Sequence, residues 1–394
     1  MTDAVRPSDR RIPVVHLHIG TMKSGTSYVQ GMLARHRDQL RQDGVLFPGA
    51  TWAVQVEAVR DLLGVSSRQP SIRAGSWDAM VAEIAQWTGT RSIVSMEMLS
   101  TADSARVERV VSSFDGSEVH AIITVRDLAR VIPSAWQEST QNRQTWTWPD
   151  YIAALTGEPD VEPLAQRRFW KQHDVAAIAE RWAEALGPER VHIVVVPPSG
   201  GPRDLLWQRF CSVVGLDPER YIAPPNVRGN PAVGAASAEL LRRLNVQVVG
   251  AIDLETYDRV VKRYLAKQTL SRRTGEYRLT LPTRYRSWAV ERSTNLVRDI
   301  QKLGIDVVGN LEELIPDEDA GADDVDVTAD AAAVTDAAVH ALSALVLELA
   351  RVDQGGGGRG ARGPGGNQGR RRQGGGRGGR AGSGHVPDPR RTDS

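Results

Sequence analysis

Short runs of apolar, largely β-branched residues alternate along the chain with longer amphipathic stretches. Four runs, at residues 13–19, 92–97, 120–125 and 190–197, have the length and composition of buried parallel strands. The stretches between them have the pattern of helices. This alternation predicts an α/β domain over residues 13–316, in which a parallel β-sheet is flanked by helices on both faces.

The pattern changes on either side of that domain. Residues 1–12 lack an apolar core, so they predict a flexible segment without a secretory signal. Residues 317–330 are acidic and predict a linker. Residues 331–353 predict a C-terminal helix. Its apolar positions recur at Val334, Ala338, Leu342, Leu345 and Leu349.

Residues 354–394 are low in complexity and rich in glycine and arginine. They contain 9 arginines against 2 aspartates, which gives a net charge of +7. Such a segment cannot bury enough apolar surface to offset the entropy of ordering, so it predicts a disordered tail. Its charge would attract polyanions such as RNA. A solubilising role is the alternative, because the tail has no aromatic residue that could stack on bases.

Composition is that of a soluble enzyme. Hydrophobic residues make up 41% of the chain, and no uninterrupted apolar run approaches the ~20 residues that cross a bilayer, so we expect no membrane span. Cys211 is the single cysteine. This excludes an intramolecular disulfide and a cysteine-based metal cluster, and it favours a reducing compartment, which we expect to be the cytoplasm.

The clearest chemistry lies in a loop between the first strand and the helix that follows it. The loop holds Lys23, Ser24 and Gly25. Thr26 and Ser27 then begin the helix. Backbone N–H groups of such a loop and of the first helical turn point toward a bound anion, and the helix dipole adds positive potential. The loop therefore predicts a site for a phosphate or sulfate group.

The position of the lysine decides which ligand class fits. In the nucleotide-triphosphatase loop a lysine directly follows the second glycine, whereas Thr26 stands there and Lys23 precedes Gly25 by two residues. The pattern T-x-K-S-G-T-[ST] at residues 21–27 instead resembles the 5′-phosphosulfate loop of sulfotransferases that use 3′-phosphoadenosine 5′-phosphosulfate (PAPS). The resemblance implies a P-loop-like fold, PAPS as co-substrate without a metal, and Lys23 as a catalytic residue within a PAPS-binding segment, residues 23–27.

A second segment resembles the same family. The strand predicted at residues 120–125 ends at Arg126, and Ser134 follows eight residues later on a helical stretch. In sulfotransferases, an arginine and a serine at this separation grip the 3′-phosphate of PAPS. The residue types suit that role, because a guanidinium gives bidentate charged donors and a hydroxyl adds a neutral one.

A third segment supplies candidates for a catalytic base. The strand at residues 92–97 ends at Glu97, where an open parallel sheet presents residues to a ligand. The resemblance to the glycan-modifying branch implies that Glu97 is the base, although Met98 stands where those relatives have lysine. His16 and His18 share one face of the first strand and are the alternative bases. For each of these three residues, a purely structural role is the other interpretation.

Two later segments extend the resemblance to roughly residues 12–316. Residues 226–231 resemble the loop that closes over the 3′-phosphate, which implies that Arg228 binds PAPS. A helical pattern follows at residues 235–248. Residues 304–314 resemble the closing portion of bacterial members of the family.

Six aromatic residues follow Arg126 and could form one wall of an acceptor pocket. Core packing is the alternative for at least half of them. They are Trp136, Trp146, Trp148, Tyr151, Phe169 and Trp170.

Together these features predict a sulfotransferase that moves a sulfuryl group from PAPS to a hydroxyl, or less readily an amine, of a carbohydrate or small-molecule acceptor. Two other functions stay open. One is a P-loop nucleotide kinase, which the displaced lysine and the lack of an acidic pair with magnesium-binding spacing disfavour. The other is a non-catalytic polyanion-binding protein that acts through its arginine-rich tail.

Overall fold

The computed structural model describes residues 12–65, 72–159, 161–222, 233–317 and 330–356. Arg228 and the segments at residues 1–11, 318–329 and 357–394 lie outside the described residues. By its contacts the chain divides into two compact units, residues 1–344 and 345–394. The sheet and the described candidate site residues belong to the first unit.

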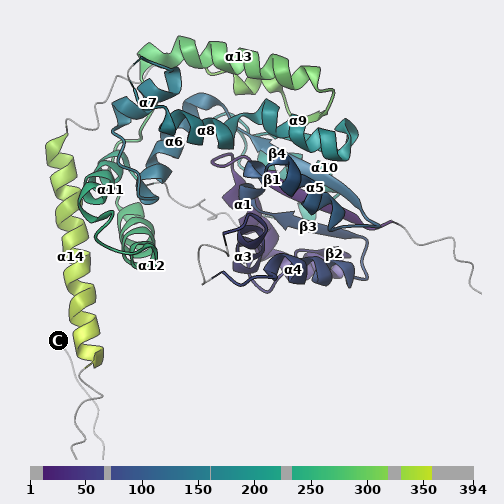
Figure 1. Ribbon diagram of the computed structural model, residues 1–394, viewed down its shortest axis with the longest axis horizontal. Coiled ribbons are helices and arrows are strands. Elements are labelled where there is room, and N and C mark those ends of the chain that lie inside the picture. The colour runs from purple at the N-terminus through teal and green to yellow at the C-terminus, as the bar shows by residue number, and fades with distance from the viewer. Residues whose placement is uncertain (1–11, 66–71, 160, 223–232, 318–329, 357–394) are drawn as a thin grey trace, which may run out of the picture. The chain divides into compact units, whose positions relative to one another are not determined.

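Six parallel strands form one sheet in the order β2-β3-β1-β4-β5-β6 (Figure 1). The predicted α/β class is therefore confirmed. All four predicted strands are present, and β2 and β6 are two further strands of two and three residues. The strands are β1 (Val14–Gly20), β2 (Val45–Leu46), β3 (Arg91–Ser95), β4 (Glu118–Val125), β5 (Val191–Val195) and β6 (Asp306–Val308).

Helices cover both faces of this sheet. One face packs against α3 (Trp52–Leu62), α4 (Ser76–Ala85), α5 (Ser104–Ser112), α9 (Val175–Leu186) and α13 (Arg286–Lys302). The other packs against α1 (Thr26–Arg35), α2 (Arg37–Gln42) and α10 (Leu205–Val214).

Further helices lie beyond the sheet. They are α6 (Leu128–Gln141), α7 (Trp148–Thr156), α8 (Leu164–His173), α11 (Ala235–Val248), α12 (Leu254–Tyr257), the π-helix η4 (Asp258–Thr269) and α14 (Ala331–Gly356). Single 3-10 turns are η1 (Glu97–Thr101), η2 (Pro188–Arg190), η3 (Pro218–Arg220), η5 (Leu270–Arg272), η6 (Thr283–Tyr285) and η7 (Leu311–Leu314).

The central strand β1 is buried on both of its faces. Val15, Leu17 and Ile19 point into the core under α3, α4 and α9. His16 and His18 alternate with them, and His18 contacts Phe210 of α10 on the opposite face. A strand enclosed in this way explains why its sequence is almost continuously apolar.

The strand order brings the three candidate motifs together. β1 lies between β3 and β4, and the carboxyl ends of parallel strands meet at one edge of a sheet. Gly20 ends β1, Glu97 follows β3 and Arg126 follows β4. The amide of Thr21 donates to the carbonyl of Thr124 at 2.7 Å, which ties the start of the loop to the end of β4.

Among the described helices, α14 passes a length and composition test for a membrane span. Its segment Ala331–Asp353 has a mean hydropathy of 1.5, and 17% of the window is buried. The sequence expectation of no span rested on uninterrupted apolar runs, whereas this helix is interrupted by Asp336, His340, Glu348 and Arg351. Core helices of soluble proteins pass the same test.

Candidate functional site

The loop at residues 20–27 contains backbone N–H groups that have no hydrogen-bond acceptor among the described residues. Gly20 adopts φ 88°, Lys23 φ 61° and Gly25 φ 81°, so the backbone takes positive φ at three residues before α1 begins. Among the residues that the structure describes, the N–H groups of residues 23–27 have no acceptor. Five unpaired donors at the start of a ten-residue helix form a site that fits an anion.

A buried hydrogen-bond chain fastens this loop to the sheet. Ser24 Oγ donates to the Thr21 carbonyl and lies 2.8 Å from Thr124 Oγ1. Thr124 Oγ1 lies 3.1 Å from His18 Nε2, and His18 Nδ1 lies 2.7 Å from Ser95 Oγ. The Ser24 hydroxyl uses its proton on the Thr21 carbonyl, so it accepts a hydrogen bond from the Thr124 hydroxyl. Thr124 in turn accepts from His18 Nε2–H. His18 Nδ1 then accepts from the Ser95 hydroxyl, so every group in the chain has a partner. The Ser24 hydroxyl therefore points inward, and its backbone N–H is the group that remains for a ligand.

The strand histidines are placed as core residues. Both ring nitrogens of His18 are occupied by this chain, and its side chain is fully buried. Burial lowers the pKa of His18 to about 3. Burial and the neighbouring His120 and His192 also lower the pKa of His16 to about 3, and its ring stacks on His120 at 5.5 Å. This placement disfavours both histidines as bases.

Glu97 lies beside the loop. A side chain at Gly20 would place its Cβ 2.7 Å from Glu97 Cβ, so the absence of a side chain at Gly20 allows the close approach. Gln30 Nε2, from α1, donates to Glu97 Oε2 at 2.6 Å. The pKa of Glu97 is raised above its ordinary 4.5, chiefly by burial and further by the negative charge of Glu138. The hydrogen bond from Gln30 and the positive charge of Lys23 lower this pKa, but they do not cancel the rise. A half-buried carboxylate with increased proton affinity therefore lies next to the loop at residues 20–27.

Lys23 pairs with a carboxylate on α6. Its Nζ lies 3.4 Å from Glu138 Oε2 on α6, and both side chains are partly exposed. The buried ring of His173 on α8 lies close enough to Lys23 for that charge to act on it. Burial first, and then Lys23, lowers the pKa of His173 to about 3. Neither ring nitrogen of His173 has a partner within the described part of the chain.

Arg126 extends from the end of β4 toward the same loop. Its Nη1 lies 3.5 Å from the Lys23 carbonyl, and its buried Nε has no partner among the described residues. Burial, and the like charges of Arg130 and Arg278, lower the pKa of Arg126 to about 10. A bound phosphate would satisfy the open donor and offset the repulsion between these arginines.

Ser134 lies within α6 (Leu128–Gln141). Its hydroxyl donates to the carbonyl of Arg130 at 2.9 Å. Pro133 is also inside this helix, whose N-terminus is capped by Asp127 accepting from the Arg130 amide. Ser134 would have to rotate its proton away from the helix to donate to a phosphate.

The six aromatic residues are mostly core. Trp136, Trp148, Tyr151 and Phe169 are at most 3% exposed. Trp136 and Trp148 lie 5.5 Å apart between ring centroids, and Tyr151 packs edge-on against Phe169. Trp146 and Trp170 are half-buried, each with an arginine over its ring. The rings therefore join α6, α7 and α8 to one another.

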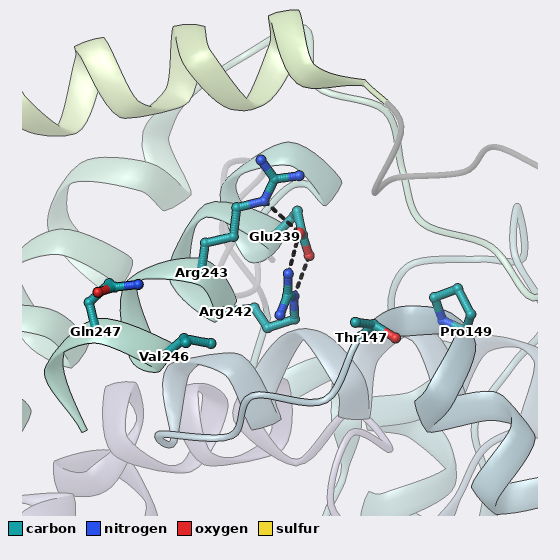
Figure 2. A pocket seen from close by; sticks show the side chains of 7 residues that line it. All are labelled: Thr147, Pro149, Glu239, Arg242, Arg243, Val246 and Gln247. Carbon is teal, nitrogen blue, oxygen red and sulfur yellow. Dashed lines mark hydrogen bonds and ion pairs between the residues drawn. The ribbon is translucent and has the colours of Figure 1, made fainter. Parts of the chain in front are cut away.

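A cavity of about 560 Å³ lies elsewhere, between α11 and the start of α7. Figure 2 shows the carboxylate of Glu239 held by Arg242 and Arg243, and the side chain of Glu239 is fully buried. Burial acts to raise the pKa of Glu239, but hydrogen bonds from the two arginines hold it below its ordinary value. Because this carboxylate already occupies donors of both arginines, and no candidate residue lines the cavity, the cavity is not assigned to the site.

Sequence reasoning missed Gln30, Glu138 and Thr124. Gln30 lies four residues after Thr26 on α1, so helical spacing places both on the face that follows the loop. Glu138 lies four residues after Ser134 on α6 in the same way. Both positions could have been inferred from the i to i+4 spacing in the sequence. The role of Thr124 could not, because it depends on which strands are neighbours in the sheet.

Comparison with known proteins adds one limited likeness. No family model matches the chain, and no curated protein matches it. Among solved structures, a sulfotransferase from Alicyclobacillus acidocaldarius aligns with 61% of this chain and 97% of its own, at 15% sequence identity and a TM-score of 0.34. A likeness of this size assigns neither a substrate nor a residue role.

Proposed function

We propose that the chain is a PAPS-dependent sulfotransferase that acts on a hydroxyl of a carbohydrate or small-molecule acceptor. The observation that carries the proposal is the loop at residues 20–27. It combines Lys23 and five amides that have no acceptor in the described part of the chain with a half-buried carboxylate, Glu97, which follows the neighbouring strand. This arrangement provides donors for an anionic group and, beside them, an acceptor for a proton.

When bound, PAPS would supply the sulfuryl group, which passes to the acceptor oxygen as its bond to the 5′-phosphate breaks and 3′-phosphoadenosine 5′-phosphate leaves. Lys23 and the amides of residues 23–27 would stabilise the negative charge that grows on the departing phosphate. Glu97 would take the proton of the acceptor hydroxyl, and its raised pKa suits that task. Lys23 must exchange Glu138 for the donor, because an ammonium paired with a carboxylate offers less charge to a ligand.

Arg126 would hold the 3′-phosphate through its open Nε and its Nη groups. Arg278, whose charge acts on Arg126, is a second candidate for that task. The Ser134 hydroxyl would add a neutral donor once it rotates away from the Arg130 carbonyl. We keep Arg228 as a further proposed contact on the strength of the sequence resemblance.

Transfer of radiolabelled sulfate from PAPS to a panel of sugar, phenol and alcohol acceptors tests the proposal. The wild type should label at least one acceptor, and Lys23→Ala should lose that labelling. Lys302→Ala is the matched control, because Lys302 is exposed and pairs with Asp299 at the end of α13. Equal labelling by the Lys23→Ala variant and the wild type would contradict the proposal.

A further inference from the structure

Trp52 is the first residue of α3 and carries an exposed indole ring. It is 36% exposed, and each of the other nine tryptophans, all of which the structure describes, is less exposed. The six aromatic residues that follow Arg126 are mostly buried, so they offer little ring surface to a ligand. Trp52 instead presents part of its ring to solvent, where another ring can pack against it.

Hydrogen bonds place this ring near Glu97. Trp52 Nε1 donates to the Ser95 carbonyl at 3.3 Å. Gln30 Nε2 donates to the same carbonyl at 3.3 Å and to Glu97 Oε2 at 2.6 Å. In addition, α3 packs against η1, the turn that begins at Glu97. The indole and the carboxylate therefore lie at the same end of β3, separated by one carbonyl group and one side-chain amide.

The start of α3 is fixed in place without a ligand. The Ser95 amide donates to Gln55 Oε1 at 2.8 Å, and Gln55 Nε2 donates to the Pro48 carbonyl at 3.0 Å. Gln55 is fully buried, so both hydrogen bonds are shielded from water. They join the first turn of α3 and the segment before it to the end of β3. A ring that is held in position before a ligand arrives loses little conformational freedom when the ligand binds.

We propose that Trp52 is an acceptor-binding residue. The face of its indole packs against the apolar face of a ring that carries the reacting hydroxyl, and Glu97 takes the proton of that hydroxyl. Pyranosides and phenols both have such a ring, whereas open-chain alcohols do not. This inference rests on the proposed function, because it takes Glu97 as the base, and it narrows the acceptor to ring-bearing alcohols.

A binding measurement that needs no turnover tests this inference. Ligand-observed NMR titrations of the full chain, with 3′-phosphoadenosine 5′-phosphate present, give dissociation constants for methyl glucoside, phenol, 2-naphthol and the open-chain xylitol. At least one of the three ring alcohols should bind at least about ten-fold more tightly than xylitol. If xylitol binds as tightly as every ring alcohol, or if no ring alcohol binds, the inference is overturned.

Variants at residue 52 separate stacking on the ring from the hydrogen bond of the indole. Trp52→Ala and Trp52→Leu should both weaken binding of the ring alcohol about ten-fold, since neither side chain has a flat face. Trp52→Phe should weaken it less than about three-fold, because phenylalanine keeps a flat face and loses only the N–H group. Leu254→Ala is the matched control and should leave the binding unchanged, since Leu254 is an exposed apolar side chain on α12.

Two results with these variants would overturn the inference. One is equal weakening by Trp52→Phe and Trp52→Ala, which would make the indole hydrogen bond, and not the ring face, the important feature. The other is wild-type affinity in Trp52→Leu, which keeps apolar bulk at this position and serves as the test if Trp52→Ala does not fold. Failure of the proposed function is seen separately, because the wild type would then neither bind 3′-phosphoadenosine 5′-phosphate nor transfer sulfate from PAPS, whatever residue 52 is.

Discussion

The loop at residues 20–27 and the aromatic helices α6 to α8 differ in how completely their groups are satisfied. In the loop, five amides lack an acceptor among the residues that the structure describes, and Lys23 is partly exposed. In the helices, Trp136 and Trp148 are buried against other rings, and the Trp136 indole donates to the Trp146 carbonyl at 3.0 Å. The loop therefore has donors that a ligand could use, whereas most of the rings are buried and already in contact with other side chains. Substitutions in the loop should therefore change activity, and substitutions among the rings should change stability.

The largest expected effect is that of Glu97→Gln, which keeps the shape of the side chain and removes its ability to accept a proton. Turnover should fall by about 10²–10⁴, while donor affinity stays within a few-fold. In the wild type, turnover should rise with pH through the raised pKa of Glu97, because the base must be deprotonated, and this limb should vanish in the variant. Steady-state rates across pH measure both effects.

The matched control for this variant is Glu108→Gln, an exposed glutamate on α5. His18 and His16 have pKa values of about 3 and should contribute no limb near neutral pH. If Glu97→Gln keeps most of its activity while His18→Asn or His16→Asn loses it, the proton goes to a strand histidine.

Lys23→Ala should follow, with a loss of about 10²–10³ in turnover, because one charged donor to the transition state is removed. Thermal unfolding should be unchanged, since Lys23 is partly exposed and its side chain pairs only with Glu138 among the described residues. Single-turnover kinetics and a melting curve measure the two properties. If the variant melts at a much lower temperature, Lys23 contributes to stability, and the proposed difference between the loop and the aromatic helices is weakened.

Trp148→Ala tests the other side of the comparison. Removing this buried ring should lower the free energy of unfolding by about 3–5 kcal/mol. Affinity for 3′-phosphoadenosine 5′-phosphate should be unchanged in the fraction that is folded. Tyr277→Ala removes a ring that is 66% exposed and should have little effect. Denaturant titration measures the free energy of unfolding, and calorimetry then measures the nucleotide affinity. A Trp148→Ala variant that is stable but does not bind the nucleotide would contradict the prediction and indicate that Trp148 lies in the ligand site.

Arg126→Ala should have a smaller effect, confined to ligands with a 3′-phosphate. A charge-assisted hydrogen bond contributes about 1.5–3 kcal/mol, so affinity for 3′-phosphoadenosine 5′-phosphate should fall by about 10–10². Ser134→Ala should reduce it only a few-fold, because the hydroxyl must first leave the Arg130 carbonyl. Adenosine 5′-phosphosulfate, which lacks the 3′-phosphate, should be nearly insensitive to both changes. Equal weakening of both ligands would exclude a 3′-phosphate role, and Arg298→Ala on α13 is the surface control.

The two regions were also unequally predictable from the sequence. The strand at residues 14–20, the loop and the start of α1 follow from local chemistry: an apolar run, two glycines and a polar helix start. β2 and β6 were missed because two or three residues carry no periodicity, and their pairing comes from neighbouring strands. The contacts of Lys23 with Glu138, and of Glu97 with Gln30, join segments far apart in sequence. No local pattern could supply the geometry of those contacts.

Calorimetric titration with 3′-phosphoadenosine 5′-phosphate and with ATP tests the central assignment of the loop most directly. We expect the first nucleotide to bind without magnesium and at least about ten-fold more tightly than ATP, because the proposed contact of Arg126 is with a 3′-phosphate, which ATP lacks. ATP binding that requires magnesium and exceeds that of 3′-phosphoadenosine 5′-phosphate would contradict it and identify the loop as a nucleotide-triphosphate site.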